Sequence, residues 1–225
     1  MPTVPDVIGE TVATALGREH RDDPVLPNTG GPAGNANLTA WLGLILLTLF
    51  LVELMTLISM SSLLGVHIFV GAFLVPVILV KTATTGWRMA RYYLRSDHYV
   101  RAGPPPALLR ILGPMVVIGA LAVVGTGLSL IALGNAAHST LFTVLGFRVD
   151  AITLHQAAFI AWAVTTGLHL LGRFVPALRL SVPPTPSAGS SAPGLASRLT
   201  LIVLTTGVAV LTGLLILEAS HSWTS

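Results

Sequence analysis

Two pairs of polar residues with equal spacing stand out in an otherwise apolar chain. His155 and His169 are 14 residues apart, and so are His67 and Lys81. In an α-helix, 14 residues make about 3.9 turns and rise about 21 Å, so both members of a pair lie on nearly the same helix face. Imidazole is the commonest metal ligand among the side chains, so the histidines are candidates for a metal site.

The composition indicates that these residues lie in membrane-spanning helices. Of the 225 residues, 53% are apolar and only 9% are charged, whereas a soluble domain carries about 25% charged residues. The charges cluster in short segments between long apolar stretches. A helix needs roughly 20 apolar residues to cross a hydrocarbon core about 30 Å thick. We therefore expect an all-α fold, a polytopic transmembrane helical bundle of about five spans.

Five stretches of the chain meet this length requirement. They are residues 38–60, 63–83, 108–133, 151–171 and 199–217. A very short turn at Ser61 and Ser62 separates the first two spans. The polar residues 1–37 are expected to form a disordered cytoplasmic tail, and the segment 176–197, rich in Pro, Ser and Gly, is expected to be a flexible linker.

The arginines predict the orientation of the spans. The loops after the second and fourth spans hold most of them: Arg88, Arg91, Arg95, Arg101, Arg110, Arg173, Arg179 and Arg198. The other two short loops hold only Arg148. Because cytoplasmic loops are enriched in Lys and Arg, the two Arg-rich loops should face the cytoplasm. We expect a multi-pass plasma-membrane protein with a cytoplasmic N-terminus and an extracytoplasmic C-terminus, and no nucleic-acid partner.

This topology makes the second and fourth spans parallel. His67 and His155 then lie at one depth near the outer surface, and Lys81 and His169 lie at another near the inner surface. Two histidines at one depth on neighbouring helices can bind a haem iron from both sides, which gives an electron-transferring b-type haem with no open site for substrate. Since the chain has no cysteine, disulfides and covalently attached c-type haem are excluded. Each histidine alone could equally be an ordinary interfacial residue.

Small and acidic residues inside the spans offer further hints. Gly71, Gly125 and Gly127 could leave room for a flat macrocycle, although small residues also serve ordinary close packing of helices. Glu53 lies in the outer half of the first span. A carboxylate in the membrane is costly, so Glu53 either marks a proton or quinone path or is protonated and hydrogen-bonded to a neighbouring helix.

Residues 60–175 resemble the membrane b-type cytochromes of the cytochrome b561-like, formate-dehydrogenase-gamma and hydrogenase-cytochrome kind. The resemblance rests on VHIFVGAFLVPVILVKTATTGWRMARYY in the second span and LHQAAFIAWAVTTGLHLLGRF in the fourth. Members of this group are four-helix bundles with two haems stacked across the membrane. The resemblance implies that His67 and His155 are ligands of the outer haem iron, and that His169 is a ligand of an inner one.

Lys81 departs from this pattern, because a di-haem member would usually place its fourth histidine there. Three interpretations remain open for this lysine, the only one in the chain. It could be an amine ligand of a second haem, it could pair with a haem propionate or a quinone, or it could extend to the cytoplasmic headgroups. Arg88 and Arg91 could likewise bind inner propionates or quinone, although topology alone explains most arginines here.

We therefore expect residues 38–175 to form a four-helix haem-binding bundle and residues 198–225 to form a peripheral fifth span with a short outer tail. The expected function is a membrane b-type cytochrome with one haem b, or two, that passes electrons between a quinone pool and a redox partner protein. It would be an electron-transfer subunit of an oxidoreductase rather than a complete enzyme, without catalytic residues of its own. The alternatives are a haem-free membrane anchor or assembly subunit, and a small transporter.

Overall fold

The computed structural model describes residues 4–16, 18, 23–104, 106–181 and 192–224. The long helices are α2 (Gly31–Thr56), α3 (Met60–Tyr93), α5 (Ala107–Leu133), α6 (Ala151–Ser181) and α7 (Leu195–Ala219). The short elements are α1 (Val4–Ala15), α4 (Asp97–Arg101), α8 (His221–Thr224), the 3-10 turns η1 (Leu57–Ser59) and η2 (Gly134–His138), and a hairpin of β1 (Phe142–Val144) and β2 (Phe147–Val149). The predicted all-α class is confirmed.

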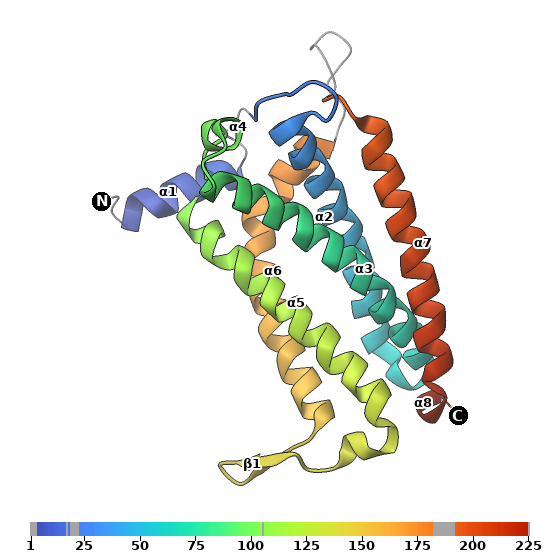
Figure 1. Ribbon diagram of the computed structural model, residues 1–225. Helices are drawn as coiled ribbons and strands as arrows, with labels where there is room; N and C mark the ends of the chain where they lie inside the picture. Colours follow the sequence, from blue (N-terminus) through green and yellow to red (C-terminus); the bar gives the residue numbers. More distant parts are fainter. Residues whose placement is uncertain (1–3, 17, 19–22, 105, 182–191, 225) are drawn as a thin grey trace.

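Four helical stretches are long and apolar enough to cross a membrane, as expected of a multi-pass membrane protein. The first of them, Gly31–Tyr93, is 63 residues long and folds back on itself at η1, so that α2 and α3 run antiparallel (Figure 1). Near the open end of this hairpin, the Asn35 side chain donates to the Thr84 carbonyl at 3.1 Å, and the Lys81 ammonium donates to the Thr39 carbonyl. The stretch therefore contains two spans, and the five spans expected from the sequence are all present as helices.

The turn of the α2–α3 hairpin differs slightly from the expected position. It occupies Leu57–Ser59, before the serine pair Ser61 and Ser62, which already belongs to α3. Leu57 and Ile58 are as apolar as the helix before them, so their composition gives no sign of a turn. Serine is tolerated in a membrane helix because its hydroxyl can bond a backbone carbonyl of the preceding turn, and Ser62 bonds the Ser59 carbonyl at 3.2 Å.

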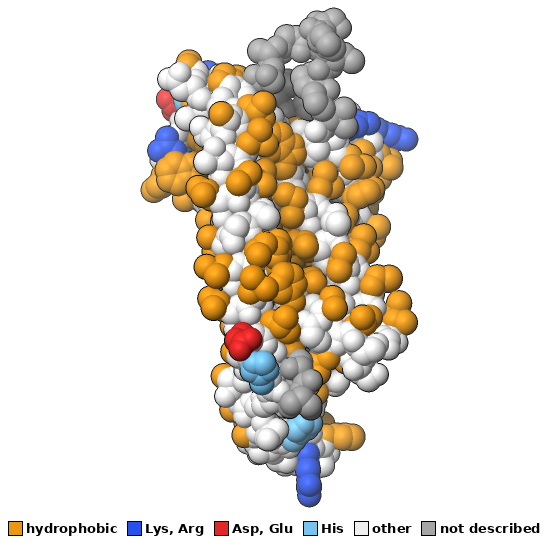
Figure 2. Space-filling view, turned by 90° about the vertical axis from the view of Figure 1, so that its right-hand side faces the viewer, with side chains coloured by type: hydrophobic (Ala, Val, Ile, Leu, Met, Phe, Trp, Pro, Cys, Tyr) orange, Lys and Arg blue, Asp and Glu red, His pale blue; other side chains and the backbone are white. Residues whose placement is uncertain are grey.

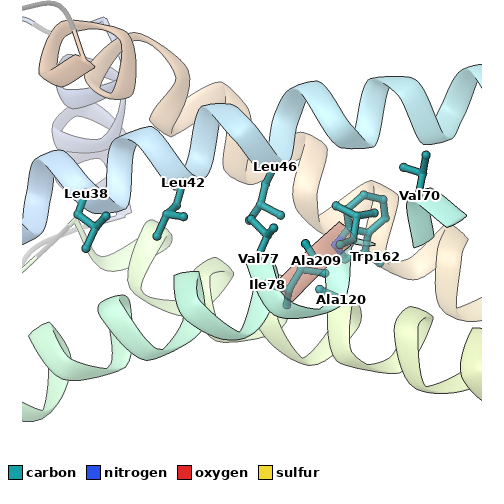
Figure 3. Packing of buried hydrophobic residues seen from close by; sticks show 10 residues of the cluster. Leu38, Leu42, Leu46, Val70, Val77, Ile78, Ala120, Trp162 and Ala209 are labelled. Atoms are coloured by element: carbon teal, nitrogen blue, oxygen red, sulfur yellow. The ribbon is translucent and has the colours of Figure 1, made fainter. Parts of the chain in front are cut away.

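The long helices pack in pairs around one apolar core. α5 packs along α6, and α3 packs along both α2 and α7, while α2 also contacts α6. The core is formed by side chains from all five helices: Leu38, Leu42, Leu46, Val70, Leu74, Val77, Ile78, Ala120, Trp162 and Ala209 (Figure 3). Figure 2 shows hydrophobic side chains over the length of one face, with charged ones confined to its two ends. Both features are those expected of a bundle surrounded by lipid.

The expected disordered tail over residues 1–37 differs from the structure. Val4–Ala15 forms α1, which packs against α5 and α6, and α2 begins within the polar region at Gly31. Contacts with distant helices stabilise a segment whose composition alone does not predict a helix. The expected linker is also shorter at both ends, because α6 continues to Ser181 and α7 begins at Leu195; its residues 182–191 lie outside the described ones.

Polar interactions stabilise the starts of α6 and α7. Asp150 accepts hydrogen bonds from the backbone N–H and the hydroxyl of Thr153, both at 2.7 Å, and so caps the first turn of α6. These bonds hold the pKa of the Asp150 carboxyl below its usual value. At the start of α7, the buried guanidinium of Arg198 donates to the carbonyls of Thr29, Pro193 and Ala192 at 3.3, 2.7 and 2.6 Å.

The packing of α2 leads to a prediction about stability. The side chain of Leu42 is 1% exposed in the core, whereas Leu51 on the same helix is 52% exposed. Because truncating a buried leucine leaves a cavity, L42A should lower the free energy of unfolding by about 2–5 kcal/mol. L51A is the matched control and should cost clearly less. Equilibrium unfolding in detergent measures both, and equal losses would contradict the core described here.

Candidate functional site

His67 of α3 and His155 of α6 lie next to each other in the half of the bundle that contains the η1 turn. Their ring centroids are 6.3 Å apart and their ring planes are almost perpendicular, at 84°. The two residues are 88 positions apart in the sequence (155 − 67). The structure thus brings together the two histidines that the sequence analysis placed at one depth.

The hydroxyl of Thr56 determines which nitrogen of His67 carries a proton. Thr56 Oγ1 donates its single proton to the Glu53 carbonyl at 2.5 Å. The same oxygen lies 2.9 Å from His67 Nδ1 and must therefore accept a hydrogen bond from it. Glu53 Oε1 lies 3.0 Å from the same nitrogen and is a second acceptor. This arrangement favours the tautomer of His67 that has its proton on Nδ1 and its lone pair on Nε2.

His155 has the same arrangement on the other side of the site. Thr126 Oγ1 donates to the carbonyls of Ala122 and Val123 at 2.7 and 3.0 Å, so its proton is already used. It lies 3.0 Å from His155 Nδ1 and accepts a hydrogen bond from that nitrogen. The same tautomer, with its proton on Nδ1 and its lone pair on Nε2, is therefore favoured for His155. Within the described part of the chain, no side chain hydrogen-bonds to Nε2 of either ring.

Glycines make room for the His155 ring and for the Glu53 carboxyl group. A Cβ on Gly127 of α5 would lie 3.2 Å from His155 Cε1, and a Cβ on Gly71 of α3 would lie 3.2 Å from Glu53 Oε1. Gly125, by contrast, faces open space. A small hollow of about 220 Å³ adjoins the site between the outer ends of α5 and α6; among the residues that line it are Thr126 and Leu154, the neighbour of His155.

The inner pair of residues is arranged differently. The Lys81 ammonium donates to the Thr39 carbonyl on α2. His169 Nδ1 is buried and has no hydrogen-bond partner among the described residues. Lys81, His169 and Arg173 lie close enough for their charges to interact. The structure therefore places this lysine against α2, in contrast to the mutual approach of the two outer histidines.

Arg88 and Arg91, which were candidates for propionate or quinone binding, both have protein partners. Arg88 forms a two-pronged ion pair with Asp23, which precedes α2. Arg91 donates to the Ser96 hydroxyl at 3.1 Å and lies over the rings of Trp87 and Tyr99 at 5.6 and 5.8 Å. These contacts hold the C-terminal end of α3 against the segments beside it.

The sequence analysis missed the two threonines that orient the histidine rings. Thr56 lies 11 residues before His67 on the other side of η1, and Thr126 belongs to a different helix from His155. A polar residue inside an apolar span is the only signal that could have indicated them. No cluster of three or more His, Cys, Asp or Glu residues occurs in the described ranges. A haem iron needs only two side-chain ligands, because the porphyrin supplies the other four.

Comparison of the chain with protein-family models, with curated proteins and with solved structures finds no match. The functional argument therefore depends on the residues and geometry of the chain itself.

The two glycines on α5 give a matched test of this site. G127A should push the His155 ring away, since the new methyl group would lie within 3.2 Å of it, whereas G125A should have no such effect. Nitrogen-15 NMR spectra of histidine-labelled protein should show both rings protonated at Nδ1, with the His155 signals shifted in G127A only. An Nε2-protonated wild-type His155 would contradict the geometry.

Proposed function

We propose that the protein is a membrane b-type cytochrome that binds one haem b between α3 and α6, with His67 and His155 as its axial ligands. The observation that carries this proposal is a pair of adjacent imidazoles, each held at Nδ1 by a threonine hydroxyl, so that Nε2 of each ring could supply a lone pair to a metal. Such a pair is the donor set of a bis-histidine haem iron.

The spacing of the rings fits this cofactor. Metal–nitrogen bonds to histidine are about 2 Å long, and the centre of an imidazole ring lies roughly 1 Å behind its nitrogen. Two imidazoles on opposite sides of one iron therefore have centroids about 6 Å apart. The observed separation is 6.3 Å. Hydrogen bonds from the far nitrogen of each ring are also typical of histidines that bind metals.

When bound, the haem supplies reversible one-electron chemistry. The side chains of this protein set the conditions for it. Thr56 and Thr126 fix the tautomer and the orientation of the two rings, while apolar side chains keep water away. Because both histidines would hold the haem iron, the centre would transfer electrons and leave no site for a substrate.

The position of the site supports an electron-transfer role for a partner. The two histidines belong to the outer half of the bundle if the Arg-rich ends of α3 and α6 face the cytoplasm. We propose that the chain is a subunit in the plasma membrane, with its N-terminus inside and its C-terminus outside. It would pass electrons between a quinone pool and an extracytoplasmic redox protein. The contact between Lys81 and Thr39 supports one haem rather than two.

Absorption spectroscopy tests the proposal directly. Protein purified from cells supplied with haem should be red, with a Soret band that shifts on reduction with dithionite, and should contain one haem per chain. H67A and H155A should each lose this haem, since one axial ligand and its oriented lone pair are gone. H221A, at a highly exposed position, is the matched control and should retain it.

Two further variants examine the inner residues. H169A and K81M should both keep the full haem content and the wild-type spectrum if the chain holds a single haem. A lost haem equivalent in either variant would show a second site. A colourless wild-type protein would overturn the cytochrome proposal and favour a haem-free membrane subunit.

A further inference from the structure

The two histidines differ in what accepts their Nδ1 proton. Thr126, a neutral hydroxyl, is the acceptor for His155, whereas His67 donates to both Thr56 and the carboxyl group of Glu53. We infer that Glu53 is a positioning residue that acts through His67 to lower the midpoint potential of the centre. This inference rests on the proposed function, because it concerns the haem that His67 would bind.

Glu53 is held in this position by three elements. It comes from the last turn of α2, and its own carbonyl accepts the Thr56 proton just before η1. Gly71 of α3 leaves the space that Oε1 occupies, since a side chain there would press on that oxygen. The second oxygen, Oε2, is buried and has no partner among the residues described. The carboxyl group thus directs one oxygen at His67 and makes no hydrogen bond to any other described residue.

The ionisable groups around Glu53 indicate that its carboxyl group acts on His67. Among the described side chains, His67 is the only ionisable group within ion-pair distance of Glu53. An acidic group within a membrane span is costly, and such groups usually have a function or a partner of opposite charge. An oxidised bis-imidazole haem carries a positive charge, which is the counter-charge that the described residues do not supply.

The expected effect follows from the strength of the hydrogen bond. A bond to an ionised acceptor is roughly twice as strong as one between neutral groups. When Glu53 is ionised, its hold on the Nδ1 proton makes Nε2 a stronger electron donor. A stronger donor stabilises the oxidised iron more than the reduced iron and therefore lowers the potential. His155, which faces a hydroxyl, contributes no such effect, so the two axial ligands are unequal.

Thr56 and Glu53 both accept the Nδ1 proton of His67. Removing one or the other acceptor should therefore shift the midpoint potential in opposite directions. E53Q replaces the acid with a neutral acceptor of the same shape and should raise the midpoint potential. T56V removes the neutral competitor, leaves the proton to Glu53, and should lower it. T126V, at the other histidine, should change the potential less than E53Q. E218Q removes an exposed outer acid and should leave it unchanged.

Spectroelectrochemical titration of the purified proteins measures these shifts, and the EPR spectrum of the oxidised protein reports the donor strength of the histidine independently. If E53Q does not retain haem, the sign of the T56V shift still decides the matter. An unchanged or lowered potential in E53Q, or a raised one in T56V, would overturn the inference. If the H67A and H155A variants both keep their haem, the proposed function is overturned instead.

Discussion

A threonine hydroxyl has one proton to donate, and in Thr56 and Thr126 a backbone carbonyl of the same helix already takes it. The hydroxyl oxygen can then only accept, and in each case the group that it accepts from is a histidine Nδ1. These two bonds hold the orientation of both histidine rings and favour a proton on Nδ1 of each. In water such bonds would exchange with solvent. In an apolar bundle water does not compete with them, so they are strong enough to define the site.

The helical hairpin of α2 and α3 makes this arrangement possible. Its turn brings Glu53 and Thr56 beside His67, and at its other end Lys81 and Asn35 tie the same two helices together. Both ends of the hairpin are therefore fixed by polar bonds, while leucines fill its middle. A shift of α2 by one turn would move Thr56 by about 5.4 Å and break its bond to His67. The register of two apolar helices thus depends on a few polar side chains.

The sequence predicted much of this structure because lipid allows few solutions. Apolar length and the absence of charge locate the five spans, and the arginine pattern predicts that α3 and α6 are parallel, which is why His67 and His155 could be paired.

The features that the sequence does not predict depend on contacts between distant residues. Thr56 and Thr126 resemble many other threonines in this chain until the fold places them beside histidines. The sequence predicts disorder where α1 forms, because the contacts with α5 and α6 that stabilise this helix do not show in its own residues. Lys81 was aligned with His169 by spacing, but spacing does not show which neighbouring helix a long side chain reaches.

The packing of α7 has a consequence for how the protein is made. This helix lies along α3, where the ring of Phe69 occupies the space beside Gly213, and Arg198 joins its start to the carbonyl of Thr29. During synthesis the chain emerges from its N-terminus, so α3 must wait for more than a hundred further residues before α7 can cover it. Until then, that face of α3 is exposed to lipid or to another protein. That face of α3 is therefore covered only after α7 has been synthesised.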